Sequence, residues 1–386
     1  MRPIHIESGK VLIDGALSET SITLKGGIID AIGDGRPRDT LVIDASNLLV
    51  LPGIVDIHGD AFERQIMPRP GVRFPHALAL LDTDRQLASA GITTAYHGLT
   101  LSWEPGLRSI DAASGFLQVL AKERSRLAVD HRVQLRLETF AFEVEDLMID
   151  QFATAPVPAL AFNDHTTSTL RKIEEGRAQQ LPEWARRAGL SVDDYLERLK
   201  NVWARRAEVP AFIERMAAAA RDAGIIMLSH DDRTIDERSH YRGIGVAIAE
   251  FPITNEAIGD ACMNDEPTVL GAPNVVRGGS HTHALNAADM IDAGQCSILA
   301  SDYHYPSMLA AIGQLVEKRG HAFEDAWRLV SEAPADALGL KDRGKLRRGL
   351  RADLVLVTRE EGRLPRAIAT LAGGRLAFLD GHERLT

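Results

Sequence analysis

Cysteine and long apolar runs are both scarce in this sequence. Only Cys262 and Cys296 occur among its 386 residues, and the N-terminal stretch MRPIHIESGK lacks the apolar core that a signal peptide needs. No segment approaches the roughly 18–20 apolar residues that span a bilayer. A disulfide framework is therefore disfavoured, no membrane association is expected, and a reducing cytoplasm is the expected location.

Positive charge is also in deficit. The formal net charge is −10 at pH 7, which argues against non-specific binding to nucleic acid or to a membrane surface. Any anionic ligand would need a local cluster of cations to hold it. The chain has 45% hydrophobic and 25% charged residues, as ordinary globular proteins do. Its length suits one barrel-sized domain or two smaller domains.

Both ends of the chain are rich in β-branched residues and turn glycines. Near the N-terminus, GKVLIDG and SITLKGGIIDAIGDG alternate short apolar stretches with turns, and GLRADLVLV near the C-terminus has the same character. We predict that residues 1–50 and 345–386 join in one small composite β-sandwich. Residues 51–344 then form the other domain.

The middle of the chain alternates short apolar runs with helical segments, which is typical of βα units around a parallel sheet. Eight such units predict a (β/α)₈ barrel of the TIM type, in the α/β class. An open doubly wound sheet is the alternative. The strand candidates are 48–57, 91–97, 132–138, 157–163, 224–229, 245–251, 267–272 and 296–301.

A long polar segment separates the fourth and fifth strand candidates. Residues 168–209 have the character of charged helix and are too long for a plain connection. The ordinary interpretation is a solvated surface. The functional alternatives are a lid over the site and a contact between the copies of a homo-oligomer.

Ionisable residues gather at the ends of five strand candidates. A single histidine or aspartate after a strand is ordinarily a loop hydrogen-bonder, but the C-terminal ends of barrel strands converge on one mouth, where active sites are built. Histidine and carboxylate without cysteine suit Zn²⁺, Mn²⁺ or Fe²⁺, with one coordination position left for water. The residues concerned are His58, Asp60, Glu138, Asp164, His165, His230, Asp231, Asp232, Asp302 and His304.

Three segments resemble the amidohydrolase superfamily: LPGIVDIHGD (51–60), ASDYH (300–304) and GKLRRGLRADLVLV (344–357). The resemblance implies a (β/α)₈ barrel with a β-sandwich built from both chain ends. It also implies two divalent metal ions, with Zn²⁺ expected first and Mn²⁺ or Fe²⁺ as alternatives. The metal ligands that it implies are His58, Asp60, Glu138, His165, His230 and Asp302.

The same resemblance divides the ligands between the two metals. His58 and Asp60 would bind the first metal, and Glu138 would bridge the pair. His165 and His230 would hold the second metal. In the superfamily these two histidines usually follow strands five and six, whereas here they follow candidates four and five. We therefore expect that our count has missed or added a strand.

Further segments are similar to one branch of the superfamily, which hydrolyses a ribose 1-phosphonate 5-triphosphate to the 5-phosphate and releases pyrophosphate in phosphonate breakdown. They are MPRPGVRFP (67–75), LSHDD (228–232), IAEFPIT (248–254), LGAPNVVRGGSH (270–281) and SDYHYPSML (301–309). Asp302 would be the catalytic residue, contacting the bridging hydroxide as general base and acid. The sequence departs from the branch at Gly59 and Ala61, where threonine and asparagine are usual, and in TTSTLRK after His165.

A triphosphate needs cations around it. Arg69 and Arg73 follow the first two ligands and could grip phosphate oxygens in a bidentate manner. For each arginine the ordinary alternative is a surface salt bridge. The expected partner is a small phosphorylated substrate. After the seventh strand candidate, Arg277 precedes four residues that could cradle another phosphate: Gly278, Gly279, Ser280 and His281.

Two rival functions remain open. An amidase or deaminase would use the same metal site on a C–N bond of a small molecule, and it would have no need of the arginine cluster. A non-catalytic scaffold within a phosphonate-pathway complex would bind metal tightly without turning over any phosphate ester. The presence of all six expected metal-site residues argues against the scaffold.

Overall fold

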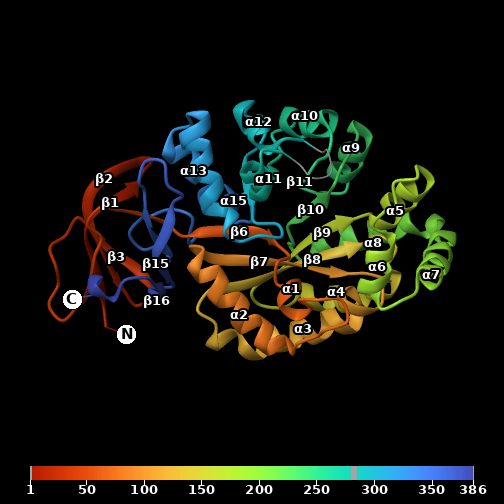
Figure 1. Ribbon diagram of the computed structural model, residues 1–386, viewed down its shortest axis with the longest axis horizontal. Helices are drawn as coiled ribbons and strands as arrows, with labels where there is room; N and C mark the ends of the chain where they lie inside the picture. The colour runs from red at the N-terminus through yellow and green to blue at the C-terminus, as the bar shows by residue number, and fades with distance from the viewer. Residues whose placement is uncertain (1, 280–284, 386) are drawn as a thin grey trace.

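A barrel of eight parallel strands forms the centre of the molecule (Figure 1), whose computed structural model describes residues 2–279 and 285–385. Each strand pairs with the next one along the chain. An isolated bridge between Gly59 and Asp302 closes the ring. The strands are β6 (Ile54–Gly59), β7 (Ile92–Leu101), β8 (Asp130–Glu138), β9 (Ala159–Asn163), β10 (Met227–His230), β11 (Ile248–Glu250), β12 (Thr268–Gly271) and β13 (Ile298–Ala300).

This strand order confirms the predicted (β/α)₈ barrel and excludes the open doubly wound sheet, whose order would reverse at a switch point. Every strand candidate overlaps one barrel strand. The expectation of a missed or added strand is therefore wrong. His165 follows β9 and His230 ends β10, the fourth and fifth strands of the barrel.

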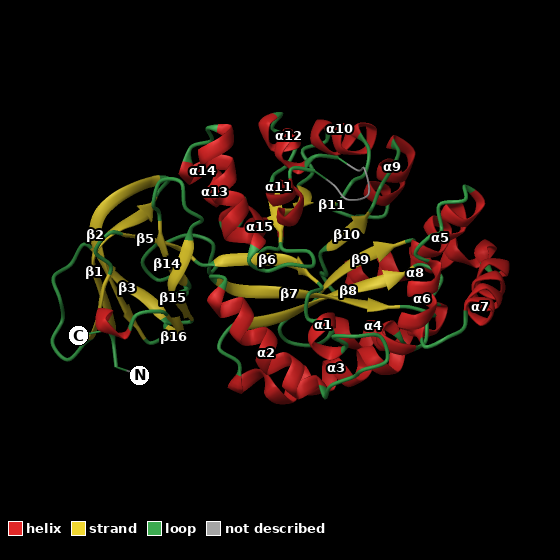
Figure 2. Ribbon diagram, in the orientation of Figure 1, coloured by secondary structure: helices red, strands yellow, loops and turns green. Residues whose placement is uncertain are grey.

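Helices follow the barrel strands in turn and cover the outside of the barrel (Figure 2). Capping side chains fix several helix starts, among them Ser109, Thr234 and Thr254. All ten residues of β7 are buried, as expected of a strand covered on both faces. Within the described residues, no helix has both the length and the apolar character that crossing a membrane requires. The helices are α1 (Glu63–Ile66), α2 (His76–Ser89), α3 (Ile110–Glu123), α4 (Glu145–Phe152), α5 (His165–Glu174), α6 (Leu181–Ala188), α7 (Val192–Ala204), α8 (Val209–Asp222), α9 (Ile235–Gly243), α10 (Asn255–Met263), α11 (Ala272–Arg277), α12 (Ala287–Asp292), α13 (Ser307–Arg319), α14 (Phe323–Arg328) and α15 (Glu332–Ala337).

Both chain ends contribute to a second eight-stranded sheet. In this sheet β5 pairs antiparallel with β14, so the strand that leads into the barrel lies beside the strand that leaves it. The sheet surrounds its own apolar cluster. The division of the chain at residues 50 and 345 stays a prediction. The strands are β1 (Ile4–Ile13), β2 (Ala16–Lys25), β3 (Ile28–Ile32), β4 (Leu41–Asp44), β5 (Leu48–Pro52), β14 (Leu354–Thr358), β15 (Arg366–Ala372) and β16 (Arg375–Leu379).

The long polar segment between the fourth and fifth strands forms α5, α6 and α7, which we call the helical insert. Its small core contains Tyr195 and Leu199, against which Trp103 from the loop after β7 packs. In Figure 1 the terminal sheet lies at one end of the molecule and the helical insert at the other. The insert therefore stands beside the C-terminal ends of β8 and β9, where the candidate site is expected.

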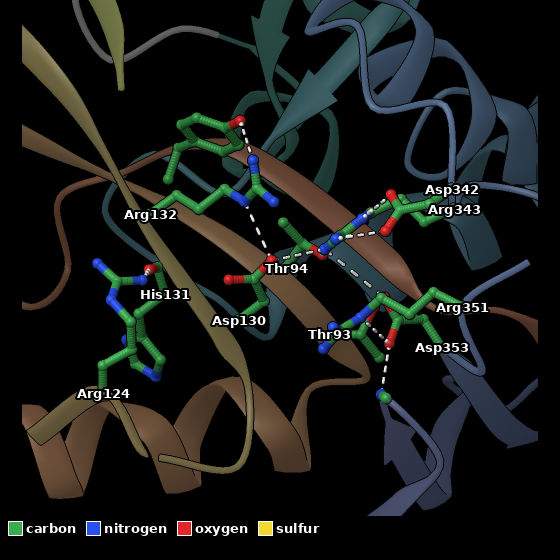
Figure 3. Close-up of polar contacts among 12 residues, drawn as sticks. Thr93, Thr94, Arg124, Asp130, His131, Arg132, Asp342, Arg343, Arg351 and Asp353 are labelled. Carbon is green, nitrogen blue, oxygen red and sulfur yellow. Dashed lines mark hydrogen bonds and ion pairs between the residues drawn. The ribbon is translucent and has the colours of Figure 1, made fainter. Parts of the chain in front are cut away.

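A polar network ties the barrel to the segment that precedes β14 (Figure 3). Arg343 is buried, and its Nη1 lies 2.7 Å from Oδ2 of Asp130 and 2.7 Å from Oγ1 of Thr94. Its Nε also lies 2.9 Å from Oδ1 of Asp342. Asp130 and Thr94 lie near the starts of β8 and β7, away from the mouth. This arginine therefore supports the fold, not the chemistry.

Replacing Arg343 tests that assignment. We expect Arg343→Ala to lower the free energy of unfolding by about 3–5 kcal/mol, because it removes a buried guanidinium that pairs with Asp130, Asp342 and Asp353. Chemical denaturation measures the change. The exposed Arg347 pairs with Asp14 at 3.3 Å, and Arg347→Ala is the control, with an expected loss below about 1 kcal/mol. Equal losses in the two variants would contradict the assignment.

Candidate metal centre

Barrel closure brings the first and last strands of the barrel together at the mouth. The backbone N–H of Asp60 donates to the carbonyl of Asp302 at 2.9 Å, and the N–H of Asp302 donates to the carbonyl of His58 at 2.9 Å. His58, Asp60 and Asp302 each offer one ligand atom, and these atoms lie within 4.8 Å of one another. Three of the predicted metal ligands thus form one group.

Gly59 has a structural reason to differ from the threonine that is usual in the branch that the sequence resembles. A Cβ atom at this position would lie 2.8 Å from Oδ2 of Asp56 and 3.0 Å from Oγ of Ser301. Asp56 accepts hydrogen bonds from the backbone N–H of Ser301 at 2.9 Å and from its hydroxyl at 2.5 Å. The close packing at barrel closure therefore requires glycine here.

His230 joins two further groups of potential ligands. One contains His165, His230 and Asp231, and the other contains His58, His230 and Glu250. Of the six predicted ligands, five fall into the three groups, which overlap at His58 and His230. The fourth and fifth strands therefore converge with the first and last on one centre.

Glu250 was not predicted as a site residue. It ends β11 and is completely buried, and its Oε1 accepts a hydrogen bond from Gln134 at 2.6 Å. Burial alone would raise the pKa of Glu250, but His58 and the hydrogen bonds to the carboxylate hold it below its ordinary value. The sequence did contain one signal for Glu250, because this carboxylate lies near the end of an otherwise apolar strand candidate.

The donor atoms of this centre fit a divalent cation. Nδ1 of His58, Nδ1 of His230 and Oε2 of Glu250 are buried and have no hydrogen-bond partner in the described part of the chain. Nδ1 of His58 lies 3.0 Å from Oε1 of Glu250, and Nδ1 of His230 lies 3.2 Å from Oδ2 of Asp231. A buried polar atom without a partner costs about 1–3 kcal/mol, and a bound cation would satisfy Oε2 of Glu250. Imidazole and carboxylate donors suit Zn²⁺, Mn²⁺ or Fe²⁺.

Unusual backbone conformations occur just after three of the barrel strands. Asp231, Phe251 and Asp302 have φ values of 65°, 50° and 54°, in the left-handed region that non-glycine residues seldom occupy. Backbone hydrogen bonds to the neighbouring strand hold each residue in place, as from Phe251 N–H to the carbonyl of Val269 at 2.9 Å. Such strain gathers at functional sites, where it orients side chains.

Asp302 has the protonation behaviour of a general base. Burial, together with the negative charge of Asp60, raises the pKa of Asp302 to about 6. A carboxylate with a pKa close to neutral accepts a proton more readily than an ordinary aspartate.

Glu138 lies beside the centre but outside the three groups of the described residues. Its carboxylate accepts hydrogen bonds from the N–H of His165 at 3.0 Å and from the N–H and hydroxyl of Thr166 at 3.2 and 2.7 Å. Burial and the neighbouring Asp164 raise the pKa of Glu138 to about 8. Its Oε2 lies 3.6 Å from Nδ1 of His165. The bridging role of Glu138 stays a prediction.

Arg136 was also missed by the sequence analysis. Its guanidinium lies 3.2 Å from Nε2 of His230 and 3.7 Å from Oδ2 of Asp60. Arginine only donates, so Nε2 of His230 accepts this hydrogen bond, and a metal bound at Nε2 would take the place of the guanidinium. The period-two pattern of β8 could have revealed this cation, since Gln134, Arg136 and Glu138 face the same side of the strand.

The predicted phosphate-binding arginines lie on two other loops. Arg69 and Arg73 are exposed beside a turn closed by the hydrogen bond from Val72 N–H to the Arg69 carbonyl, and neither has an ion pair with another described residue. Arg277 ends α11 and donates to the hydroxyl of Tyr303 at 3.3 Å. Gly278 and Gly279 follow it with φ of 76° and 151°, while Ser280 and His281 lie outside the described residues.

Comparison with known proteins identifies the class. The model of the Amidohydrolase family matches residues 138–375, so the chain belongs to this family. It is 27% identical over 365 residues to the alpha-D-ribose 1-methylphosphonate 5-triphosphate diphosphatase of Escherichia coli (strain K12), covering 93% of this chain and 96% of that protein.

Solved structures share the fold. The N-acetylglucosamine-6-phosphate deacetylase of Pasteurella multocida has 12% identity and a TM-score of 0.62, with 97% of this chain and 99% of that chain covered. The beta-aspartyl dipeptidase of Fervidobacterium islandicum AW-1 has 14% identity and a TM-score of 0.64, with 99% and 98% covered. These similarities support the barrel with its additional terminal sheet.

Proposed function

We propose that this hydrolase converts a ribose 1-phosphonate 5-triphosphate to the 5-phosphate and pyrophosphate, in phosphonate catabolism. The similarity to the Escherichia coli diphosphatase carries the proposal, because it extends over 93% of this chain and 96% of that protein. The segments that suggested this substrate lie at or after the C-terminal ends of β6, β10, β11, β12 and β13, and they include His230, Arg277 and Asp302. A cytoplasmic location and a homo-oligomeric state stay predictions.

In this proposal the chain holds two divalent ions, with Zn²⁺ expected first. His58, Asp60 and Asp302 would hold one, and His165 and His230 the other, with Glu138 between them and Glu250 as an added ligand. A divalent ion lowers the pKa of water to about 7 and neutralises charge on a phosphoryl group. Asp302 would take the proton of the attacking water and return it to the leaving oxygen.

In the proposed reaction water attacks the phosphorus nearest the ribose, so the two outer phosphoryl groups leave together as pyrophosphate. Arg69, Arg73 and Arg277 would hold these groups by charge-assisted hydrogen bonds. The net charge of −10 gives no long-range attraction for a polyanion, and local guanidinium groups must supply it. An amidase or deaminase acting on an uncharged C–N bond would not depend on them.

Arg277→Ala separates these possibilities. We expect KM for the triphosphate to rise about 10- to 100-fold, the effect of one charge-assisted hydrogen bond, and the rise to shrink for the matched monophosphate ester. Arg363 is exposed between β14 and β15 and pairs with Glu360, so Arg363→Ala is the control and should leave both values unchanged. Equal penalties on the two substrates would make Arg277 a structural residue.

The reaction itself is tested by assaying pyrophosphate release from ribose 1-methylphosphonate 5-triphosphate, with metal-loaded and with chelator-treated protein. A panel of small amides serves as the comparison. We expect pyrophosphate release with the loaded protein alone. Hydrolysis of an amide without any release of pyrophosphate would replace the proposal with the amidase function.

A further inference from the structure

A cavity of about 170 Å³ lies between the candidate metal centre and the helical insert, and we call it the insert cavity. Glu138 and His165 line its inner side. The insert contributes Lys172, from the helix that begins at His165, and Arg187 from α6. Lys172 lies about two helical turns, or roughly 10 Å, beyond His165. This separation is on the scale of a ribose that carries a phosphoryl group at each end.

The carboxylates that line the insert cavity already have partners. Glu104 accepts hydrogen bonds from the hydroxyl of Tyr195 at 2.7 Å and from Nη2 of Arg187 at 2.9 Å. Glu138 accepts three hydrogen bonds from His165 and Thr166 at the start of α5. Both carboxylates of the cavity thus already accept hydrogen bonds from other groups of the protein.

Two donor groups of the insert cavity have no such partner. The ammonium group of Lys172 lies 5.6 Å from the centre of the Trp184 ring and has no carboxylate partner among residues 2–279 and 285–385. Nε of Arg187 is buried and has no hydrogen-bond partner within the same ranges. The cavity therefore has donors and positive charge to offer, which match a small, oxygen-rich anion.

A second cavity, of about 820 Å³, lies next to the insert cavity and shares Trp103 and Glu104 with it. Its other carboxylates outnumber its single cation, Arg198, and would repel an anion. They are Asp111, Glu143, Asp194 and Glu197. Of the two neighbouring cavities, the insert cavity is therefore the one whose charges suit an anionic group.

The order of the barrel strands places the predicted phosphate-binding arginines and Lys172 on opposite sides of the barrel mouth. Arg277 follows β12, and Arg69 and Arg73 follow β6, so these arginines lie on the two sides of β13, where the ring closes. TIM barrels often bind phosphate beside strands seven and eight. Lys172 follows β9, which lies across the barrel from β13. A substrate attacked at its first phosphorus would extend its pyrophosphate toward one side and its ribose toward the other.

We infer that the insert cavity binds the phosphonate group at C1 of the ribose, through Lys172 and Arg187. This inference rests on the proposed function for the substrate. The helical insert is then a specificity element, because its two cations recognise the end of the substrate that does not react. They act on KM and leave the rate of the chemical step unchanged.

Paired variants and paired substrates test the inference. We expect Lys172→Gln to raise KM for ribose 1-methylphosphonate 5-triphosphate about tenfold, the lower end of the range for a charged hydrogen bond. KM for ribose 5-triphosphate, which lacks the phosphonate, should not change, and neither should kcat. Lys172→Arg should keep the wild-type KM. Arg187→Gln should behave as Lys172→Gln does, whereas Lys200→Gln and Arg186→Gln, which alter exposed cations of the same insert outside the cavity, should have no effect.

An unchanged KM in Lys172→Gln, or an equal rise for both substrates, would overturn the inference. If neither substrate is turned over, the proposed function fails. Direct titration of the metal-loaded protein with methylphosphonate then tests separately whether the insert cavity binds an anion. A roughly tenfold weaker affinity in Lys172→Gln than in Lys200→Gln would then support an anion site in the insert cavity. Equal affinities would overturn it.

Discussion

Asp302→Asn should fold as the wild type does and, at saturating metal, hold its metal through the other ligands, yet lose about 10²–10⁴-fold in kcat, the usual effect of removing a general base. The side chains have the same shape, but an amide oxygen does not take the proton of the attacking water. Asp302 is suited to the task because burial and Asp60 raise its pKa to about 6. Steady-state kinetics with saturating metal measures the loss.

Two measurements make the Asp302 result decisive. Metal analysis and thermal denaturation of Asp302→Asn should match the wild type, which separates lost chemistry from a lost ligand or a lost fold. Asp292→Asn, at the exposed end of α12, is the matched control and should retain full activity. A near-normal kcat in Asp302→Asn would assign the base to another residue.

His230→Ala should have a large effect on the metal. His230 belongs to two of the three ligand groups, whereas His165 and Asp231 each belong to one. Loss of a residue that only supports a ligand typically weakens metal affinity by 10- to 100-fold, so we expect more than about 100-fold for His230→Ala. Stabilisation by added metal should fall with it, because a ligand stabilises only the folded state that binds it.

Competition with a chelator of known affinity measures the metal affinity of each variant. His165→Ala should lose less affinity than His230→Ala, and the exposed His240→Ala should lose none. An equal loss of affinity in His165→Ala and His230→Ala would mean that His230 is not shared by two ligand groups. Unchanged affinity in His230→Ala would remove the fifth strand from the metal centre.

The barrel and five residues of the candidate metal centre were predictable because their signals are local. A strand buried on both faces is apolar along its whole length, so a histidine or aspartate where that run ends is conspicuous, as at His58, His230 and Asp302. The superfamily's usual strand positions led to the wrong expectation of a missed strand. The pairing order places the two histidines on the fourth and fifth strands.

Glu250 and Arg136 were missed because their roles depend on contacts distant in sequence. Glu250 bonds to Gln134 of a strand three places away, and Arg136 lies between His230 and Asp60. Neither contact leaves a local pattern. Gly59 likewise looked like a change near the substrate until its contact with Asp56 and Ser301 tied it to barrel closure.

The segment GKLRRGLRADLVLV shows how a family signature differs from a site. It suggested the superfamily as strongly as the strand-end motifs did, but Arg351 and Asp353 within it bind each other at 2.9 Å. Asp353 also accepts a hydrogen bond from the N–H of Gly373 at 2.7 Å, in the terminal sheet. The insert cavity had no sequence signal, since its walls come from α5, α6 and the loop after β7.

The central claim is that water attacks the phosphorus nearest the ribose and displaces pyrophosphate. The direct test is hydrolysis of ribose 1-methylphosphonate 5-triphosphate by the metal-loaded protein in ¹⁸O-labelled water, with both products analysed by mass spectrometry. We expect one ¹⁸O atom in the ribose 1-methylphosphonate 5-phosphate product and none in the pyrophosphate. Label in the released pyrophosphate, or release of orthophosphate in its place, would contradict the claim.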